Sequence, residues 1–168
     1  MDFALDDEQR GFADAVRRFA RDKLAPGALA RAHAPQFPWD AARLVAEQGL
    51  MGIAFPEADG GQGGTLLHAV LAIQEVALAC PKSADIVQAG NFGPIRTFVE
   101  YATAEQKARY LPDLLGGRKL IALGMSEPDA GSAVTELKTS ARIESFPVRG
   151  VQPSFGRCSS ERATASAG

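Results

Sequence analysis

Apolar residues recur at close to helical spacing near the start of the chain, and charged residues fill most positions between them. The apolar positions are Phe12, Val16, Phe19 and Leu24. Asp6 and Gln9 both precede this run. They lie three residues apart, which is the spacing of a capping box and marks a helix N-terminus. The pattern predicts an amphipathic first helix that docks on a core, stops at Pro26-Gly27 and leads into a connector up to Pro38.

The same periodicity predicts further helices downstream. They are expected over residues 39–48, 65–80, 84–101 and 103–115. Gly49 suits the C-terminal cap of the first of these, and Thr103 with Gln106 forms a second capping box at the start of the last. The helix over 65–80 is apolar nearly all round, which predicts a position in the middle of a bundle.

The segment between residues 51 and 64 contains Pro56 and a cluster of glycines. Gly60, Gly61, Gly63 and Gly64 make any regular element unfavourable, so a surface loop is expected. Such glycines can cradle a phosphate, but no Gly-Lys-Ser/Thr sequence follows them. The loop is therefore interpreted as a link between two helices.

The pattern changes after the last predicted helix. Lys119 is followed by the continuous apolar run Leu120-Ile121-Ala122, which predicts the start of a β element. Beyond Ala141 no period can be followed, and a disordered tail is expected. The predicted fold class is an all-α helical bundle over 1–117, followed by the start of a β-domain over 118–141 and an irregular tail over 142–168.

The composition narrows the class of protein. With 46% hydrophobic and 23% charged residues, the 168-residue chain is ordinary for a soluble globular domain. A formal net charge of −2, with Lys and Arg spread along the helices, argues against nucleic acid as a partner. The N-terminus is acidic where a targeting peptide would be basic, so a cytoplasmic location is expected. Gln74 and Glu75 interrupt the longest apolar stretch, which is too short for a membrane span.

Cysteine and histidine are too sparse for a metal centre built by the protein. The residues of these types are Cys80, Cys158, His33 and His68, and none forms a CxxC pair. A zinc site would lack well-spaced ligands, so no metal site is expected. Both cysteines are interpreted as reduced and without a chemical role.

A turn rich in small residues follows the apolar run directly. Residues 123–132 read Leu-Gly-Met-Ser-Glu-Pro-Asp-Ala-Gly-Ser. A strand that ends in such a turn leaves main-chain N–H groups free, and small side chains let a phosphate or the edge of an aromatic cofactor approach them closely. The segment can therefore hold a nucleotide.

The order of several short motifs resembles one enzyme family. Met125-Ser126-Glu127-Pro128 followed by Ala130-Gly131-Ser132 is similar to the first signature of the acyl-CoA dehydrogenases, flavoenzymes that desaturate acyl-CoA thioesters. Upstream, the segments Glu47–Leu50, Gly60–Gly63, Thr103–Lys107 and Tyr110–Pro112 also stand in the order found in that family. The resemblance extends from residue 3 to about residue 141 and stops abruptly near Arg142.

The resemblance implies FAD as the cofactor and assigns candidate residues to it. The implied cofactor-binding residues are Leu123, Gly124, Met125, Ser126, Glu127, Pro128, Asp129, Ala130, Gly131 and Ser132. Main-chain groups around Met125 and the Ser126 hydroxyl would face the pyrimidine and N5 edge of the flavin, where fixed donors tune its potential. Ser132 would contact both FAD phosphate and the acyl-CoA substrate. Ala133 stands where the family more often has Asp, and the missing carboxylate removes an acceptor that would order the turn.

The resemblance also implies the parent reaction and its partners. Family members transfer electrons from an acyl-CoA substrate to an electron-transfer flavoprotein and form homo-oligomers. Their catalytic base usually lies in a C-terminal domain, and no position in this chain matches it, so no catalytic residue is assigned. Glu127 is a turn residue in the family and is not this base. The chain alone is therefore expected to be inactive and to retain little or no FAD.

Other interpretations stay open at this stage. Residues from about 142 onward resemble the product of a shifted reading frame in a GC-rich gene, or the end of a truncated one. A non-catalytic helical module that binds a protein partner, or a dead gene fragment, is the alternative from another class. Within the superfamily, an acyl-CoA oxidase or a flavin monooxygenase is the nearest enzymatic alternative, and the acyl chain length cannot be predicted.

Overall fold

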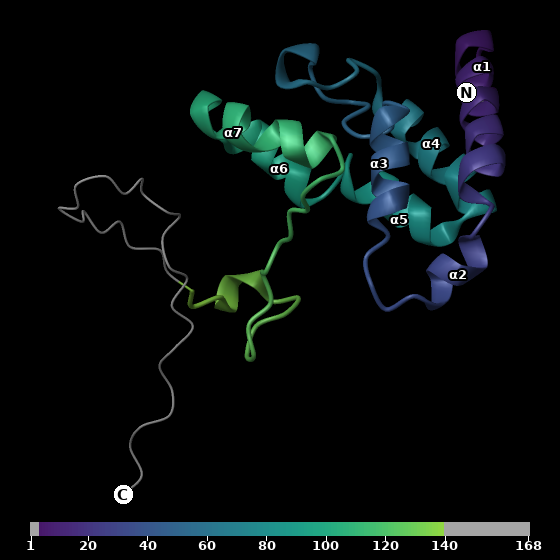
Figure 1. Cartoon of the computed structure of the whole chain (residues 1–168). Helices are drawn as coiled ribbons and strands as arrows, with labels where there is room; N and C mark the ends of the chain where they lie inside the picture. The colour runs from purple at the N-terminus through teal and green to yellow at the C-terminus, as the bar shows by residue number, and fades with distance from the viewer. Residues whose placement is uncertain (1–3, 140–168) are drawn as a thin grey trace, which may run out of the picture. The chain divides into compact units, whose positions relative to one another are not determined.

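The computed structural model describes residues 4–139. The chain divides into two compact units, Met1–Leu123 and Gly124–Gly168, and each is treated by itself. The first unit contains α1 (Asp7–Phe19) with the π-helical turn η1 (Ala20–Leu24), α2 (Ala28–His33), α3 (Trp39–Glu47), the 3₁₀ turn η2 (Glu57–Asp59), α4 (Leu66–Ala79), α5 (Pro81–Ala89), α6 (Pro94–Tyr101) and α7 (Ala104–Leu115) (Figure 1). The expected helical bundle is confirmed.

Both capping boxes expected from the sequence are present. The Gln9 N–H donates to Asp6 Oδ1 at 2.8 Å, and the Asp6 N–H donates to Gln9 Oε1 at 3.1 Å. Thr103 and Gln106 make the equivalent reciprocal pair at the start of α7. Each pair satisfies N–H groups that the first turn of a helix leaves without an intrahelical partner, so these helix starts are fixed locally.

The main core lies where α1, α3, α4 and α5 meet (Figure 1). Its largest members include Val16, Leu24, Val45, Ile53, Val76 and Ile86. A second, smaller cluster joins α6 and α7 to the loop before α4. It consists of Phe55, Ile95, Val99, Leu111 and Leu114. The residues between α3 and α4 therefore connect both cores.

One short helix was not anticipated. Residues 28–33 form α2, whereas the sequence pattern indicated a connector there. None of the α2 residues is buried, and a helix of six residues is too short to show a periodic apolar face in the sequence. Gly27 precedes it with a φ of 80°, a left-handed conformation that glycine adopts without steric cost.

The predicted helix over 84–101 was wrong as a single element. It is divided into α5 and α6, and the chain turns between Gly90 and Gly93. Gly93 has a φ of 64°, and Pro94 occupies the first turn of α6. Proline has no N–H to continue the preceding helix but fits the first turn of a new one, so the glycine and proline together separate the two helices.

The expectation that α4 is buried on all sides holds for one face only. Ala69, Ala72 and Val76 are completely buried against α1 and α5. On the other face, Leu66, Val70 and Leu78 are 47%, 49% and 77% exposed. Leu66 and Val70 are neighbours at i, i+4 on this face, and Gln74 occupies the next position of the same row before Leu78. Within residues 4–139 these apolar side chains are uncovered, but the exposed Gln74 separates Leu78 from the other two.

A buried carboxylate links α4 to α1. Glu75 is 3% exposed, and its two oxygens accept hydrogen bonds from Arg17 Nε and Nη2, each at 2.8 Å. This planar two-point contact is the strong form of an arginine–carboxylate pair. The hydrogen bonds and the charge of Glu75 raise the pKa of Arg17 above its ordinary value. The pair fixes the register between the two helices.

The β element expected after Lys119 is not formed in the described residues. Residues 119–126 adopt no regular structure. Residues 124–139 contain one antiparallel bridge, Glu127 with Ala130, and a 3₁₀ turn, η3 (Val134–Glu136). A strand exists only when a neighbour satisfies its N–H and C=O groups, and no second strand occurs between residues 4 and 139. The tail predicted over 142–168 and the end of the 118–141 segment lie outside the described residues.

No helix within residues 4–139 has both the length and the apolar character needed to cross a membrane. The same range contains no group of three or more His, Cys, Asp or Glu residues arranged to bind a metal ion. Cys80 is a free, buried thiol.

Candidate functional site

The ten residues that the motif nominates form an open stretch of backbone. Leu123 ends the first unit, and residues 124–132 begin the second. Leu123 and Met125 are 61% and 53% exposed, and Ser126, Gly131 and Ser132 are exposed as well. Ala130 is the buried member of the set. Most of these residues are therefore accessible within the unit that contains them.

The backbone donors of this stretch are largely unused. Glu127 and Ala130 exchange main-chain hydrogen bonds of 2.9 and 3.2 Å. The N–H groups of Met125, Ser126 and Ser132 have no hydrogen-bond acceptor among residues 4–139. Free N–H groups next to small residues are what an anionic or aromatic cofactor edge can bind.

Two glycines in the stretch face open space. Nothing in the protein lies within 4 Å of a Cβ placed on Gly124 or on Gly131, and neither has a left-handed φ. Neither the backbone conformation nor the packing of the chain itself therefore requires glycine there. Space left beside a glycine allows close approach of a ligand to the main chain. This geometry fits a nucleotide cofactor such as FAD.

The Glu127 side chain closes the segment that runs from the second half of the motif to Leu137. Its carboxylate accepts hydrogen bonds from the Lys138 N–H at 2.9 Å and from the Thr139 N–H at 2.7 Å, and the Thr139 hydroxyl donates a further one. The hydroxyl of Thr139, then the N–H groups of Lys138 and Thr139, hold the pKa of Glu127 below its ordinary value. No sequence pattern predicts these contacts, because the partners are 11 and 12 residues away and follow no periodic spacing.

Acidification is expected to open this closure. A carboxyl whose pKa is lowered in the folded state contributes its bonds fully above the ordinary value of 4.5 and loses them as the pH falls through the lowered pKa. An NMR titration of the Glu127 side-chain carboxyl carbon, with the Thr139 amide followed in parallel, measures both events. A Glu127 pKa at or above 4.5 would contradict the hydrogen bonding described here.

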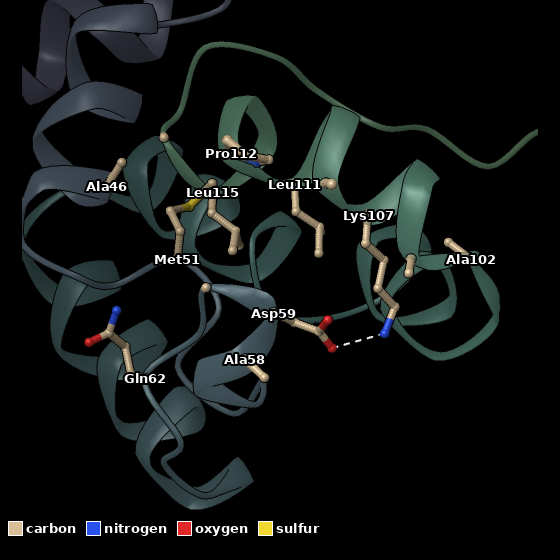
Figure 2. A pocket seen from close by; sticks show the side chains of 14 residues that line it. Ala46, Met51, Ala58, Asp59, Gln62, Ala102, Lys107, Leu111, Pro112 and Leu115 are labelled. Atoms are coloured by element: carbon tan, nitrogen blue, oxygen red, sulfur yellow. Dashed lines mark hydrogen bonds and ion pairs between the residues drawn. The ribbon is translucent and has the colours of Figure 1, made fainter.

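A cleft of about 700 Å³ lies in the helical unit, between the loop around η2 and α7 (Figure 2). Met51, Leu111 and Leu115 supply its apolar surface. Its charged groups are paired with each other, since Lys107 Nζ lies 2.9 Å from Asp59 Oδ2. None of the ten nominated residues lines this cleft.

Solved structures of known proteins share this fold. The chain superposes on butyryl-CoA dehydrogenase from Megasphaera elsdenii with a TM-score of 0.70 at 31% identity, covering 84% of this chain and 38% of the other. It also matches a glutaryl-CoA dehydrogenase from Mycobacterium smegmatis in complex with FADH2, with a TM-score of 0.74 at 26% identity over 83% and 36% of the two chains. The helical unit is thus of the kind found in flavin-dependent acyl-CoA dehydrogenases.

The sequence comparisons identify the family itself. The model of the acyl-CoA dehydrogenase N-terminal domain matches residues 6–118. Acryloyl-CoA reductase (NADH) from Anaerotignum propionicum is 39% identical over 86% of this chain and 36% of its own length. The short-chain specific acyl-CoA dehydrogenase of Clostridium acetobutylicum is 33% identical over 86% and 38%. The chain belongs to the acyl-CoA dehydrogenase family and spans little more than a third of these relatives.

Proposed function

We propose that this chain is the flavin-facing N-terminal portion of an acyl-CoA dehydrogenase-like flavoprotein. The parent reaction is the FAD-dependent α,β-dehydrogenation of an acyl-CoA thioester, with electrons passed to an electron-transfer flavoprotein. The open, donor-rich backbone from Met125 to Ser132 carries the proposal, together with family membership. A bound FAD would supply the hydride acceptor.

The chain's own residues would contribute binding and orientation. Free N–H groups at Met125 and Ser126 can hold the pyrimidine edge of the isoalloxazine by fixed hydrogen bonds. The exposed Ser132 hydroxyl and N–H can hold an FAD phosphate oxygen and contact the acyl-CoA substrate. Gly131 leaves the space through which such a group reaches the main chain. No residue between 4 and 139 is assigned the proton abstraction.

The cofactor role predicts weak but site-specific FAD binding. The chain is expected to lose FAD on gel filtration, because it spans only 36–38% of the relatives named above and much of the family's flavin contact lies further along. Titration with FAD, followed by flavin fluorescence, should still show saturable binding. Gly131→Leu should weaken that binding at least about tenfold, since the new side chain fills the approach to the main chain.

The control for this experiment is the thermal stability of the same variant. A Cβ at Gly131 meets no protein atom within 4 Å, so Gly131→Leu should leave the midpoint of thermal unfolding unchanged. A stoichiometric yellow preparation after gel filtration would overturn the expected weak retention. Equal FAD affinity in the parent chain and the variant would overturn the proposed site.

One observation favours a second function from another class. The exposed apolar side chains of α4, Leu66, Val70 and Leu78, suit a helical module that binds a protein partner. The two functions differ in their response to FAD. A flavoprotein fragment is stabilised thermally by added FAD, whereas a partner-binding module is not.

The relatives differ in the reactions that their names describe. They include a 3-sulfinopropanoyl-CoA desulfinase from Paraburkholderia xenovorans, 34% identical over 83% of this chain. This fold portion is therefore compatible with more than one reaction on CoA thioesters. Oxygen uptake and sulfite release are the readouts that separate oxidase, monooxygenase and desulfinase activities from dehydrogenation.

A further inference from the structure

In the second unit, hydrogen bonds join the two ends of the segment from Pro128 to Leu137. The Glu127 carboxylate, just before the segment, accepts hydrogen bonds from the N–H groups of Lys138 and Thr139, just after it, and from the Thr139 hydroxyl. Each carboxylate oxygen of Glu127 has its own donor residue: Oε2 accepts from the Lys138 N–H and Oε1 accepts from the Thr139 N–H. The enclosed chain contains Pro128 to Ser132, half of the ten residues of the proposed flavin segment.

Among residues 4–139, few other contacts hold this segment. Main-chain bonds between Glu127 and Ala130 form one tight turn, and η3 forms another. Neither connects the start of the segment to its end. An ion pair between Lys138 and Asp129 spans 3.9 Å, but both side chains are about four-fifths exposed, at 78% and 83%. Exposed pairs of this kind contribute little to stability. The Glu127 bonds are therefore the main closure.

The chemistry of the closure depends on a charged carboxylate. An ionised carboxylate is acceptor-only, and its hydrogen bonds to N–H and O–H groups are stronger than those between neutral groups. A glutamine at this position would keep one acceptor oxygen and turn an NH₂ toward one of the present donors. Closing a segment of this length also removes chain entropy, which must be offset by the bonds at its ends.

We propose that Glu127 is a positioning residue for the flavin segment. By fixing Lys138 and Thr139 against the start of the segment, it holds the Gly131 and Ser132 main chain in the open arrangement described above. Glu127 acts through these residues and is not assigned a direct role in the reaction. The proposal rests on the proposed FAD function and adds to it a residue that acts by preorganisation.

The test compares Glu127→Gln with a matched control, Glu136→Gln. Glu136 lies inside the same segment, and its exposed side chain accepts no hydrogen bond from residues 4–139. Hydrogen exchange at the Lys138 and Thr139 amides of the full chain reports closure, and FAD titration reports positioning. Glu127→Gln should speed exchange at both amides and weaken FAD binding, each roughly tenfold, since charge-assisted bonds are lost. Glu136→Gln should change neither.

A second pair of variants separates positioning from mere structure. Thr139→Ser keeps the hydroxyl donor and should bind FAD as the parent chain does. Thr139→Val removes that donor and should weaken FAD binding about threefold or more. If the parent chain binds FAD and Glu127→Gln binds it equally well, the positioning role is overturned. If the parent chain binds no FAD, the proposed function itself fails, and the flavin-positioning role falls with it.

Discussion

Replacing Asn91 by alanine is expected to destabilise the helical unit by about 3–5 kcal/mol. Asn91 is fully buried in the turn between α5 and α6. Its side-chain oxygen accepts the Ile53 N–H at 2.6 Å, and its amide nitrogen donates to the carbonyls of Leu50 and Val87 at 2.8 and 2.7 Å. Alanine would leave three buried backbone groups without partners and a cavity beside them.

The position of Asn91 explains why the effect is large. Its bonds join the end of α5 to the chain that follows α3, at the point where both cores meet. Asparagine is suited to this task because one short side chain supplies both an acceptor and two donors. No apolar residue of similar volume can satisfy the groups that surround it. The measurement is urea unfolding followed by circular dichroism of the helices.

The controls for Asn91 separate hydrogen bonding from the removal of any side chain nearby. Gln88→Ala, on the exposed face of α5, should change the free energy of unfolding by less than about 0.5 kcal/mol. Asn91→Asp keeps the shape but loses the donors. Burial raises the pKa of the new carboxyl, so its penalty is fully present at high pH and is relieved as the pH falls below that raised value. A variant with alanine at 91 that unfolds like the parent chain would contradict this account.

The sequence was most informative where structure is decided locally. The capping boxes at Asp6 and Thr103 each involve residues three positions apart, and both formed as expected. The same holds for the long helices, whose periodic faces are visible in any short window. The missed break between α5 and α6 is local too. Its signal was Gly93-Pro94, which the apolar period on either side concealed.

Contacts between distant positions could not be predicted from the pattern. Asn91 reaches Leu50 and Ile53 across 41 and 38 residues, and Glu75 reaches Arg17 across 58. The expected strand at Leu120–Ala122 failed for a related reason, since a strand depends on a partner and not on its own residues alone. The candidate flavin segment came from resemblance to a family, and the structure adds the open glycines and the Glu127 closure, which no short pattern reveals.

The glycine-rich loop before α4 provides the second large effect. Gly61→Ala is expected to destabilise the helical unit by about 2–3 kcal/mol, because the added methyl group has no room. A Cβ at this position would lie 2.3 Å from the Phe55 carbonyl oxygen and 2.6 Å from its carbonyl carbon. These are backbone atoms, so no side-chain rotation can relieve the clash.

Displacing Phe55 would also disturb its main-chain hydrogen bond and the packing of its ring in the smaller core. Its carbonyl accepts the Gly63 N–H at 2.9 Å, and its ring, 2% exposed, belongs to the core beneath α6 and α7. The loop therefore uses Gly61 for close packing of the chain on itself. This agrees with its interpretation as a link between helices and gives the glycine a steric reason that needs no ligand.

The chain offers a matched control for this substitution. Gly11 lies on the exposed side of α1, and a Cβ there would meet nothing within 4 Å. Gly11→Ala should stabilise the chain by about 0.5–1 kcal/mol, because alanine is the better helix former. The two glycine-to-alanine changes are thus expected to have opposite signs in the same urea unfolding experiment. A Gly61→Ala variant as stable as the parent chain would show that the loop can move away from Phe55, and the close packing would then not be what requires glycine at this position.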